Sequence, residues 1–426
     1  MNSITINPVR RISGQATVPG DKSISHRALM LAAIAEGESR ITNLATGADV
    51  RSTRTCLQRL GVDIEVDERE TRVRARSLEA LQSASRPLDA GNSGTTMRLL
   101  SGILATRPFT TTIIGDESLS CRPMRRIIEP LQRMGAKVEA APRQTAPLKI
   151  TGGGLHGIHY ELPVASAQVK SCILFAGLDA AGETVVIQPS PTRDHSERLL
   201  AAMGAHIDYG DQRIVMRSSR LRNVELNVPG DFSSAAFLLA AAVLLPGSEL
   251  RLTNVGLNPT RTAFMQVLLE MGGRLEFPEW HLQAIEPYGD LVARHGPLRG
   301  FELEPGFVPQ LIDEIPILAV LATRAAGETV ITGASELRLK ESDRLAALTK
   351  NLRAMSVNVE ELPDGLIIQG PARLRGADID SCGDHRIAMA FAIAGLCADS
   401  PTTISNPECA DISFPGFFET LRSLCR

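Results

Sequence analysis

The stretch VPGDKSISHRALMLAAIAEGE, residues 18–38, sets a plan that the rest of the chain repeats. A Pro-Gly turn leads to Asp21, a typical helix N-cap, and a helix of small apolar residues follows. Lys22, Ser23 and Arg27 lie at or near the first turn of this helix, where cations oppose the helix dipole. A bound anion would remove that conflict, because the unpaired N–H groups and the cations would bind it together. The stretch therefore predicts a small-anion site at a helix N-terminus.

The tetrapeptide VPGD recurs at residues 228–231 and is again followed, one residue later, by a serine. Because such repetition can reveal the whole fold, we looked for more of it. Six stretches share one plan of turn residues, a small-residue apolar helix, a short break and a β-branched strand. They cover residues 21–41, 89–114, 165–187, 230–252, 313–332 and 382–404.

A second, more polar helix follows five of these stretches and leads into another strand. Its apolar residues recur every three or four positions, which is typical of an amphipathic helix. These helix-and-strand pairs cover residues 51–66, 122–140, 197–209, 262–277 and 344–361. The predicted unit is thus strand, buried helix, strand, amphipathic helix and strand, about 70 residues long. The sixth unit lacks the amphipathic part.

The first helix of each unit is apolar on nearly every side, which predicts that it is buried, with sheets and amphipathic helices outside. We therefore predict an α/β fold with six repeated βαβαβ-type units, three in each of two lobes, and the buried helices inside. Because the second VPGD lies halfway along the chain, the N-terminal strand should join the C-terminal lobe. Residues 1–19 and 230–426 would form lobe 1, and residues 20–229 would form lobe 2.

Composition limits the partners and the compartment. The net charge of −3 does not favour nonspecific binding to nucleic acid. The seven cysteines form no CxxC motif, which argues against a disulfide framework or a zinc site and favours a reducing compartment. The start, MNSITINPVRR, has no apolar signal segment, and the longest apolar run, residues 235–245, is too short to span a bilayer. We expect a cytoplasmic monomer that acts on small molecules, without nucleic-acid or membrane partners.

Polar side chains gather where the buried helices begin. They are Lys22, Ser23 and Arg27; Asn92, Ser93, Gly94, Thr95 and Arg98; Ser166, Gln168 and Lys170; Asp231, Ser233 and Ser234; Asp313 and Glu314; and Asp384, His385 and Arg386. Helix capping explains the serines, threonines and aspartates, and Asp313 with Glu314 would suit a capping pair. Capping does not explain the cations, which predict anionic ligands held between the lobes.

A second group of cations lies just before the amphipathic helices, at Arg122, Arg193, Lys340 and Arg344. Lys340 and Arg344 are four residues apart, which predicts that they share one face of a helix, with Glu341 between them. An exposed salt-bridge ladder is the alternative interpretation of this spacing.

Six motifs carry a resemblance to a known family. PGDKSISHRAL at residues 19–29, GNSGTTMRL at 91–99, LSCRPM at 119–124, LIDEIP at 311–316, LKESDR at 339–344 and GDHRIAMA at 383–390 resemble the 5-enolpyruvylshikimate-3-phosphate (EPSP) synthase family. They occur in order along the whole chain, and several positions resemble the more divergent bacterial branch. The resemblance implies a two-lobed inverse α/β architecture. It also implies transfer of the enolpyruvyl group of phosphoenolpyruvate to the 5-hydroxyl of shikimate 3-phosphate, on the route to chorismate and the aromatic amino acids, with no cofactor and no metal.

The resemblance also assigns roles to residues. Phosphoenolpyruvate would be bound by Lys22, Gly94, Arg122, Gln168, Arg344 and Arg386, and shikimate 3-phosphate by Lys22, Ser23, Arg27, Ser166, Gln168, Arg193, Asp313 and Lys340. Asp313 would be the general base and Glu341 the general acid, with Lys22 assisting or replacing Glu341 as the acid. Gly94 would leave room that favours sensitivity to glyphosate. Ile412 stands where some members have a phosphate-binding lysine, so that contact is in doubt.

Two other functions remain open at this point. The first is the related UDP-N-acetylglucosamine enolpyruvyl transferase, which the KSISHR and LKESDR motifs oppose. Cys121 precedes Arg122 where that family has a reactive cysteine, but SLSCRPM lacks that family's glycine-rich loop, so we interpret Cys121 as incidental. The second is a two-lobed anion-binding protein without catalysis, which would not need Glu341.

Overall fold

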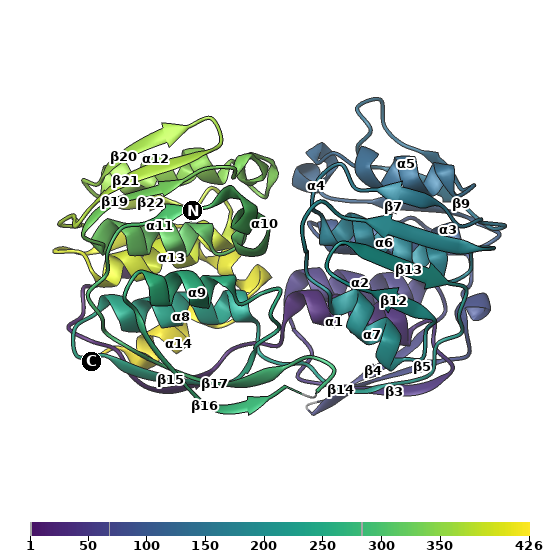
Figure 1. Cartoon of the computed structure of the whole chain (residues 1–426), viewed down its shortest axis with the longest axis horizontal. Coiled ribbons are helices and arrows are strands. Elements are labelled where there is room, and N and C mark those ends of the chain that lie inside the picture. Colours follow the sequence, from purple (N-terminus) through teal and green to yellow (C-terminus); the bar gives the residue numbers. More distant parts are fainter. Residues whose placement is uncertain (1, 68, 283) are drawn as a thin grey trace. The chain divides into compact units, whose positions relative to one another are not determined.

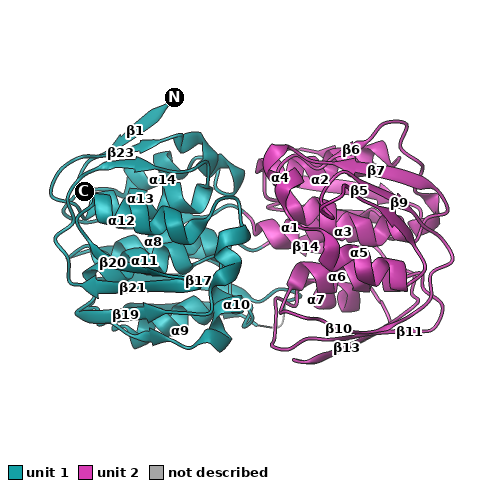
Figure 2. Cartoon of the chain, turned by 90° about the horizontal axis from the view of Figure 1, so that it is seen from above, with its two compact units in different colours: residues 1–19, 229–426 teal, residues 20–228 magenta. Residues whose placement is uncertain are grey.

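The chain divides into two compact units, Met1–Pro19 with Pro229–Arg426 (unit 1) and Gly20–Val228 (unit 2) (Figure 2). The computed structural model describes residues 2–67, 69–282 and 284–426. Each unit has its own helices and sheets, and the two are described separately.

Within the described residues, unit 2 contains three four-stranded sheets (Figure 1). The first has the order β14 (Glu225–Asn227), β3 (Gly37–Thr42), β5 (Glu70–Ala75) and β4 (Asp63–Val66). The second has the order β6 (Leu88–Asp89), β7 (Thr110–Ile114), β9 (Leu148–Thr151) and β8 (Lys137–Glu139). The third has the order β10 (His159–Glu161), β11 (Glu183–Ile187), β13 (Arg213–Arg217) and β12 (Ile207–Tyr209).

Three helices of unit 2 are almost wholly buried: α1 (Lys22–Ala32), α3 (Gly94–Ala105) and α6 (Ala167–Gly177). Three more are amphipathic and buried on one side: α2 (Ala48–Arg59), α5 (Arg125–Arg133) and α7 (His195–Ala202). The short helices η1 (Leu78–Ala80) and α4 (Glu117–Cys121) lie in connections.

Unit 1 follows the same plan. Its described residues form two four-stranded sheets. One has the order β16 (Arg274–His281), β17 (Tyr288–Arg294), β15 (Glu249–Gly256) and β2 (Ser13–Thr17). The other has the order β18 (Glu302–Leu303), β19 (Gly327–Ile331), β21 (Gly365–Gly370) and β20 (Asn358–Leu362). A three-stranded sheet has the order β1 (Ser3–Ile6), β23 (Thr402–Ser405) and β22 (Asp378–Asp380). The buried helices are α8 (Phe232–Leu244), α11 (Ile315–Arg324) and α13 (His385–Leu396).

The remaining helices of unit 1 are more exposed. They are α9 (Ala263–Glu270), α10 (Val308–Leu311), α12 (Arg344–Ala354), α14 (Phe417–Leu424) and the short η2 (Pro305–Phe307), η3 (Ser335–Leu339) and η4 (Pro407–Ile412). The predicted α/β repeat with buried helices is confirmed, and a hairpin such as β8–β9 adds a fourth strand to the predicted unit.

Strand pairing explains why the repeat starts with VPGD twice. In four repeats of the described chain one parallel pair joins the strands before and after a buried helix, as β6 and β7 do around α3, where the other pairs are antiparallel. The repeats of α1 and α8 exchange strands in this parallel pair. β2 precedes α1 but pairs with β15, which follows α8, whereas β14 precedes α8 but pairs with β3, which follows α1. The chain therefore passes from one unit to the other at each VPGD.

Close backbone contacts explain the glycines of these two motifs. A Cβ atom on Gly20 would lie 1.9 Å from the Asn43 carbonyl oxygen. A Cβ atom on Gly230 would lie 2.7 Å from Val18 Cγ2, and the neighbouring Asp231 N–H donates to the Pro19 carbonyl oxygen at 2.8 Å. A larger residue at Gly20 would force the backbone apart where the chain enters unit 2.

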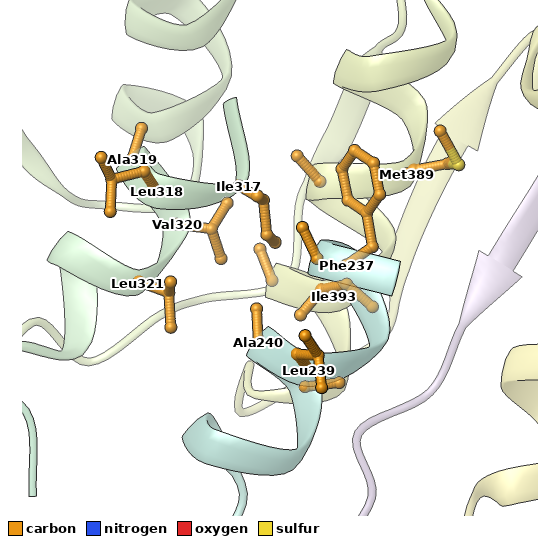
Figure 3. Packing of buried hydrophobic residues seen from close by; sticks show 14 of the residues in the cluster. Phe237, Leu239, Ala240, Ile317, Leu318, Ala319, Val320, Leu321, Met389 and Ile393 are labelled. Atoms are coloured by element: carbon orange, nitrogen blue, oxygen red, sulfur yellow. The ribbon is translucent and has the colours of Figure 1, made fainter. Parts of the chain in front are cut away.

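The core of unit 1 lies where its three buried helices meet. Figure 3 shows side chains of α8, α11 and α13 gathered there, among them Phe237, Ile317 and Ile393, all 0% exposed. Every residue of α8 is buried, as the all-round apolar pattern predicted. This packing holds the N-termini of the three helices in place, because each helix is fixed along its length.

No single helix in the described part of the chain is long and apolar enough to cross a membrane. One bent pair of helices, Pro305–Leu311 with Ile315–Arg324, has the length and composition of a membrane span, and this is judged on length and composition alone.

Candidate active site

Side-chain caps begin five of the six buried helices in the described part of the chain. The caps are Asp21, Ser93, Ser166, Asp231 and Asp384, each accepting a hydrogen bond from a backbone N–H two or three residues later. The exception is α11, where Glu314 has the N-cap position but its carboxylate does not cap. It accepts a hydrogen bond from the Ser233 hydroxyl instead. The expectation that Asp313 and Glu314 form a capping pair is therefore wrong for Glu314.

Lys22 is the first residue of α1, and a carboxylate of α2 holds its ammonium group there. Lys22 Nζ lies 3.1 Å from Asp49 Oδ2, and the two side chains are 17% and 12% exposed. The carboxylate offsets the unfavourable position of a cation at a helix N-terminus. Asp49 belongs to no motif that the sequence singled out, so this partner was not predicted.

Arg27 lies one turn further along α1 and is buried. Its Nε donates to Ser196 Oγ at 2.7 Å, its Nη2 to Ser171 Oγ at 2.9 Å and its Nη1 to the Ser23 carbonyl oxygen at 2.9 Å. Arg27 thus joins α1 to α6 and α7. Arg193, just before α7, donates from Nη1 to Ser23 Oγ at 3.5 Å. Unit 2 therefore brings Ser23, Arg27 and Arg193 together, as expected of one binding region.

The N-termini of α3 and α6 meet through a second set of polar groups. Arg98 Nη1 donates to Gln168 Oε1 at 2.6 Å, and Gln168 Nε2 donates to Thr95 Oγ1 at 2.9 Å. A Cβ atom on Gly94 would lie 2.9 Å from Arg98 Nη1 and 3.6 Å from Arg122 Nη1. Gly94 thus leaves two guanidinium groups side by side at a helix N-terminus. Such an arrangement suits a carboxylate or a phosphate, which guanidinium groups bind through paired hydrogen bonds.

Hydrogen bonds orient the Arg122 guanidinium, which follows α4 and is 9% exposed. Its Nη2 donates to Asn92 Oδ1 at 2.7 Å and to Ser118 Oγ at 3.3 Å. Asn92 in turn donates to Asp116 Oδ2 at 2.8 Å. Arg122 is therefore held beside the start of α3.

A fully buried ion pair supports this region. Lys170 Nζ lies 2.6 Å from Glu197 Oε1, with the two side chains 0% and 2% exposed. Lys170 also donates to the Thr192 carbonyl oxygen at 3.4 Å. The ion pair ties α6 to α7, and the bond to Thr192 ties α6 to the segment that carries Arg193. Lys170 is one of the polar residues at the helix starts, and its ammonium group is paired with Glu197 inside unit 2.

Buried hydroxyl groups link the starts of α1 and α3. His26 Nδ1 lies 2.7 Å from Thr53 Oγ1, which lies 2.7 Å from Thr96 Oγ1, and Thr96 donates to the cap Ser93 at 2.8 Å. Burial, then the charges of Lys22 and Arg27, holds the pKa of His26 well below 6.5. His26 is thus a neutral positioning group in the neutral pH range.

Arg344 is the centre of the polar cluster in unit 1. It is 1% exposed on its side chain, and its Nε lies 2.8 Å from Asp384 Oδ2, its Nη2 2.6 Å from Glu341 Oε2 and its Nη1 3.5 Å from Asp313 Oδ1. Burial lowers the pKa of Arg344, but the three carboxylates outweigh it and hold the pKa above its ordinary value. Burial likewise raises the pKa of Asp384, yet the Arg344 charge holds it below the ordinary 3.8.

Asp313 also contacts a second arginine. Arg386, the second residue of α13, donates from Nη1 to the Asp313 carbonyl oxygen at 3.0 Å, and its Nε lies 3.4 Å from Asp313 Oδ1. Two guanidinium groups and two carboxylates that the sequence predicted as site residues, those of Asp313 and Glu341, are thus brought together.

The helical face predicted for Lys340 and Arg344 is wrong. α12 begins at Arg344, after the N-cap Asp343, whose Oδ1 accepts from the Ala346 N–H at 3.1 Å. Lys340 and Glu341 precede the helix, so the four-residue spacing does not place Lys340 beside Arg344. Glu341 nevertheless reaches the Arg344 guanidinium from this loop.

The predicted site residues fall in both units. Those in unit 2 are Lys22, Ser23, Arg27, Gly94, Arg122, Ser166, Gln168 and Arg193, and those in unit 1 are Asp313, Lys340, Glu341, Arg344 and Arg386. Among the described residues no three His, Cys, Asp or Glu side chains are arranged as a metal site. Ile412 ends η4 and packs partly against the core of unit 1.

Comparisons with known proteins point to one family. A family model of EPSP synthase (3-phosphoshikimate 1-carboxyvinyltransferase) matches residues 6–421. A 3-phosphoshikimate 1-carboxyvinyltransferase from Desulforudis audaxviator is 50% identical over 425 residues, which is 99% of each chain. Another, from a Synechococcus species, is 52% identical over 429 residues, covering 99% of this chain and 96% of that protein. A solved EPSP synthase from Acinetobacter baumannii has a TM-score of 0.89 at 41% identity, covering 99% of this chain and 98% of that one.

Proposed function

The chain belongs to the EPSP synthase family, and we propose how its residues divide the work of the reaction. It transfers the enolpyruvyl group of phosphoenolpyruvate to the 5-hydroxyl of shikimate 3-phosphate and releases phosphate, a step of the shikimate pathway to the aromatic amino acids. The match excludes the UDP-sugar enolpyruvyl transferase and the anion-binding protein without catalysis.

Phosphoenolpyruvate is bound by cations of both units. In unit 2 these are Lys22 and Arg122, with Gln168 and the backbone at Gly94. The proposal is supported by the two guanidinium groups that adjoin Gly94 at the start of α3. A phosphate and a carboxylate carry several acceptor oxygens, and arginine pairs with them through parallel hydrogen bonds.

Shikimate 3-phosphate is bound at the start of α1 and α6. Ser23, Arg193 and Ser166 would take its phosphate and hydroxyl groups, with Arg27 and Lys340 completing the set. The hydrogen bond from Arg193 to Ser23 supports this grouping. Each nitrogen of the Arg27 guanidinium donates a hydrogen bond inside unit 2, so its proposed contribution is to fix Ser23 and to add charge.

Asp313 and Glu341 move the protons. Asp313 takes the proton of the 5-hydroxyl of shikimate 3-phosphate as the hydroxyl oxygen attacks C2 of phosphoenolpyruvate. Glu341 gives a proton to the methylene carbon. The resulting tetrahedral intermediate then loses phosphate as Glu341 takes a methyl proton back, which restores the double bond. The proton held by Asp313 passes to the leaving phosphate. The carrying observation is that both carboxylates contact the Arg344 guanidinium, at 3.5 Å and 2.6 Å.

Arginine pairing gives these carboxylates a way to respond to substrate. Arg344 and Arg386 are proposed to bind the carboxylate of phosphoenolpyruvate, and both now contact Asp313. The substrate would compete for the same guanidinium groups and release the two side chains for proton transfer. Lys22 is the alternative acid, since its ammonium group is held near the start of α1 by Asp49.

We further propose that the protein acts as a cytoplasmic monomer. The seven cysteines, all of them within the described residues, are free, which favours a reducing compartment.

Steady-state kinetics of Asp313→Ala and Glu341→Gln test these roles. Each change should lower kcat at least about 100-fold, since a positioned acid or base contributes roughly that much. Binding of shikimate 3-phosphate to Glu341→Gln, measured by calorimetry, should stay near wild type. Glu360→Gln, which removes an exposed carboxylate of β20, is the control and should keep wild-type kcat. Turnover near wild type in both test variants would remove the assignment.

A further inference from the structure

Two adjacent acids precede α11, and each is held by a different buried arginine. Asp313 Oδ1 lies 3.5 Å from Arg344. Glu314 Oε1 lies 3.9 Å from Arg261 Nη2, and it accepts a hydrogen bond from the Ser233 hydroxyl. Arg261 Nη2 itself donates to Ser233 Oγ at 2.6 Å. The two acids are therefore fixed through separate contacts.

Arg261 has a counterpart in unit 2. The tripeptide PTR precedes both α7 and α9 and ends in Arg193 and in Arg261. Each arginine reaches the serine that follows a VPGD motif: Arg193 lies 3.5 Å from Ser23, and Arg261 lies 2.6 Å from Ser233. The two arginines thus make the same contact in the two units.

Burial and neighbouring carboxylates distinguish the two. The Arg261 side chain is 3% exposed, and it contacts Asp231 at 3.6 Å as well as Glu314, whose side chains are 7% and 0% exposed. Beside Arg261 the anions are Asp231 and Glu314 of the chain itself, whereas the anion proposed to lie beside Arg193 is a substrate. Arg261 is therefore suited to holding a segment of the protein rather than a ligand.

We propose that Arg261 is a positioning residue for the reaction, acting through Glu314 to fix the turn that presents Asp313. This rests on the proposed role of Asp313 as the base. A base must lie within hydrogen-bond reach of the proton it removes, and a misplacement of about 1 Å can lower the rate about 100-fold. Asp313 directly precedes Glu314, so a shift of the Glu314 backbone after loss of its anchor at Arg261 would move Asp313 as well.

The variants Arg261→Met and Glu314→Gln test this, with Arg251→Met as the control. Arg251 also forms an ion pair in unit 1, 2.7 Å from Asp290, but on β15 rather than beside α11. Both test variants should lower kcat at least about tenfold and shift its pH profile, while KM for shikimate 3-phosphate changes little. The control should keep the wild-type kcat. Urea unfolding shows how much of each variant is folded, and kcat is expressed per folded enzyme.

Chemical rescue separates positioning from general damage. Glu314→Ala should regain part of its kcat when formate is added, because formate can take the place of the lost carboxylate beside Arg261. The double variant Glu314→Ala/Arg261→Met should not respond to formate.

The outcomes distinguish this proposal from the role of Asp313. If Asp313→Ala keeps wild-type turnover, the assigned base fails. If Asp313→Ala is inactive but Glu314→Gln has the wild-type kcat and pH profile, the positioning role of Arg261 is overturned. It is also overturned if formate raises the kcat of Glu314→Ala and of Glu314→Ala/Arg261→Met equally.

Discussion

Replacing Asp384 with asparagine should destabilise unit 1 by about 3 kcal/mol at neutral pH. Removing one partner of a buried ion pair lowers the free energy of unfolding by about 3–5 kcal/mol, because the other charge is left uncompensated. Arg344 keeps Glu341 at 2.6 Å and Asp313 at 3.5 Å, so the lower end applies. Asparagine still accepts the capping bond from the Arg386 N–H, which Asp384 Oδ1 accepts at 2.9 Å, so the helix cap is kept. The charge is lost, together with the hydrogen bonds that Asp384 Oδ2 accepts from Arg344 and Ser342.

Trp280, the single tryptophan, lies on β16 and reports unfolding of unit 1. With a urea m-value of about 3 kcal/mol per molar, a loss of about 3 kcal/mol lowers the midpoint by about 1 M. The pKa of Asp384 is held below 3.8, so its charge contributes fully above that value and the contribution is lost as pH falls through its folded-state pKa. The difference between variant and wild type should therefore shrink at the most acidic pH values.

Asp380→Asn is the matched control, because Asp380 pairs with Lys350 at 2.9 Å on the exposed surface of the same unit. Its effect should stay below about 0.5 kcal/mol. A loss below about 1 kcal/mol for Asp384→Asn at neutral pH, or a loss that stays constant down to the most acidic pH, would refute the reasoning.

Three further predictions concern unit 2. Gly94→Ala should raise KM for phosphoenolpyruvate in steady-state assays with little change in melting temperature, because the new Cβ, 2.9 Å from Arg98 Nη1, displaces a flexible side chain rather than backbone. His26→Gln should reduce the loss of stability below pH 6.5, measured as urea midpoints by circular dichroism. In the wild type the buried imidazole stays neutral, whereas His26 of the unfolded chain takes up a proton, so acid favours unfolding. Unchanged acid sensitivity of the variant would contradict this. Lys170→Met should destabilise by about 3–5 kcal/mol, and Lys170→Met/Glu197→Leu should recover most of it, since the second change removes the unpaired buried charge; a double variant no more stable than the single one would exclude this account.

The repeated units were predictable because burial leaves a strong trace in sequence. The all-round apolar pattern of α8 predicts burial, and the short polar residues before each helix predict its cap. The two VPGD motifs predict where the chain crosses between lobes, and in the structure Gly20 of the first motif lies against the Asn43 carbonyl oxygen, where a Cβ atom would not fit.

Long-range pairs in the site were not predictable in the same way. Asp384 reaches Arg344 only after helices from different repeats have packed together, and Asp49 reaches Lys22 only after the buried and amphipathic helices of one repeat have packed together. The spacing of Lys340 suggested a helix, although Asp343 is a good N-cap and signals a later start. For Arg261 a signal was present in the repeated PTR tripeptide.

The assignment of Glu341 as the acid is tested most directly by the exchange of solvent deuterium. In D2O, protonation of the methylene carbon followed by deprotonation places deuterium in the enolpyruvyl group of the product. The rate of this incorporation is measured by mass spectrometry for Glu341→Gln and for Lys22→Met. Incorporation should be lost in Glu341→Gln, whereas Lys22→Met should keep incorporation for each turnover that it completes. Wild-type incorporation by Glu341→Gln, with loss in Lys22→Met, would contradict the account and make Lys22 the acid.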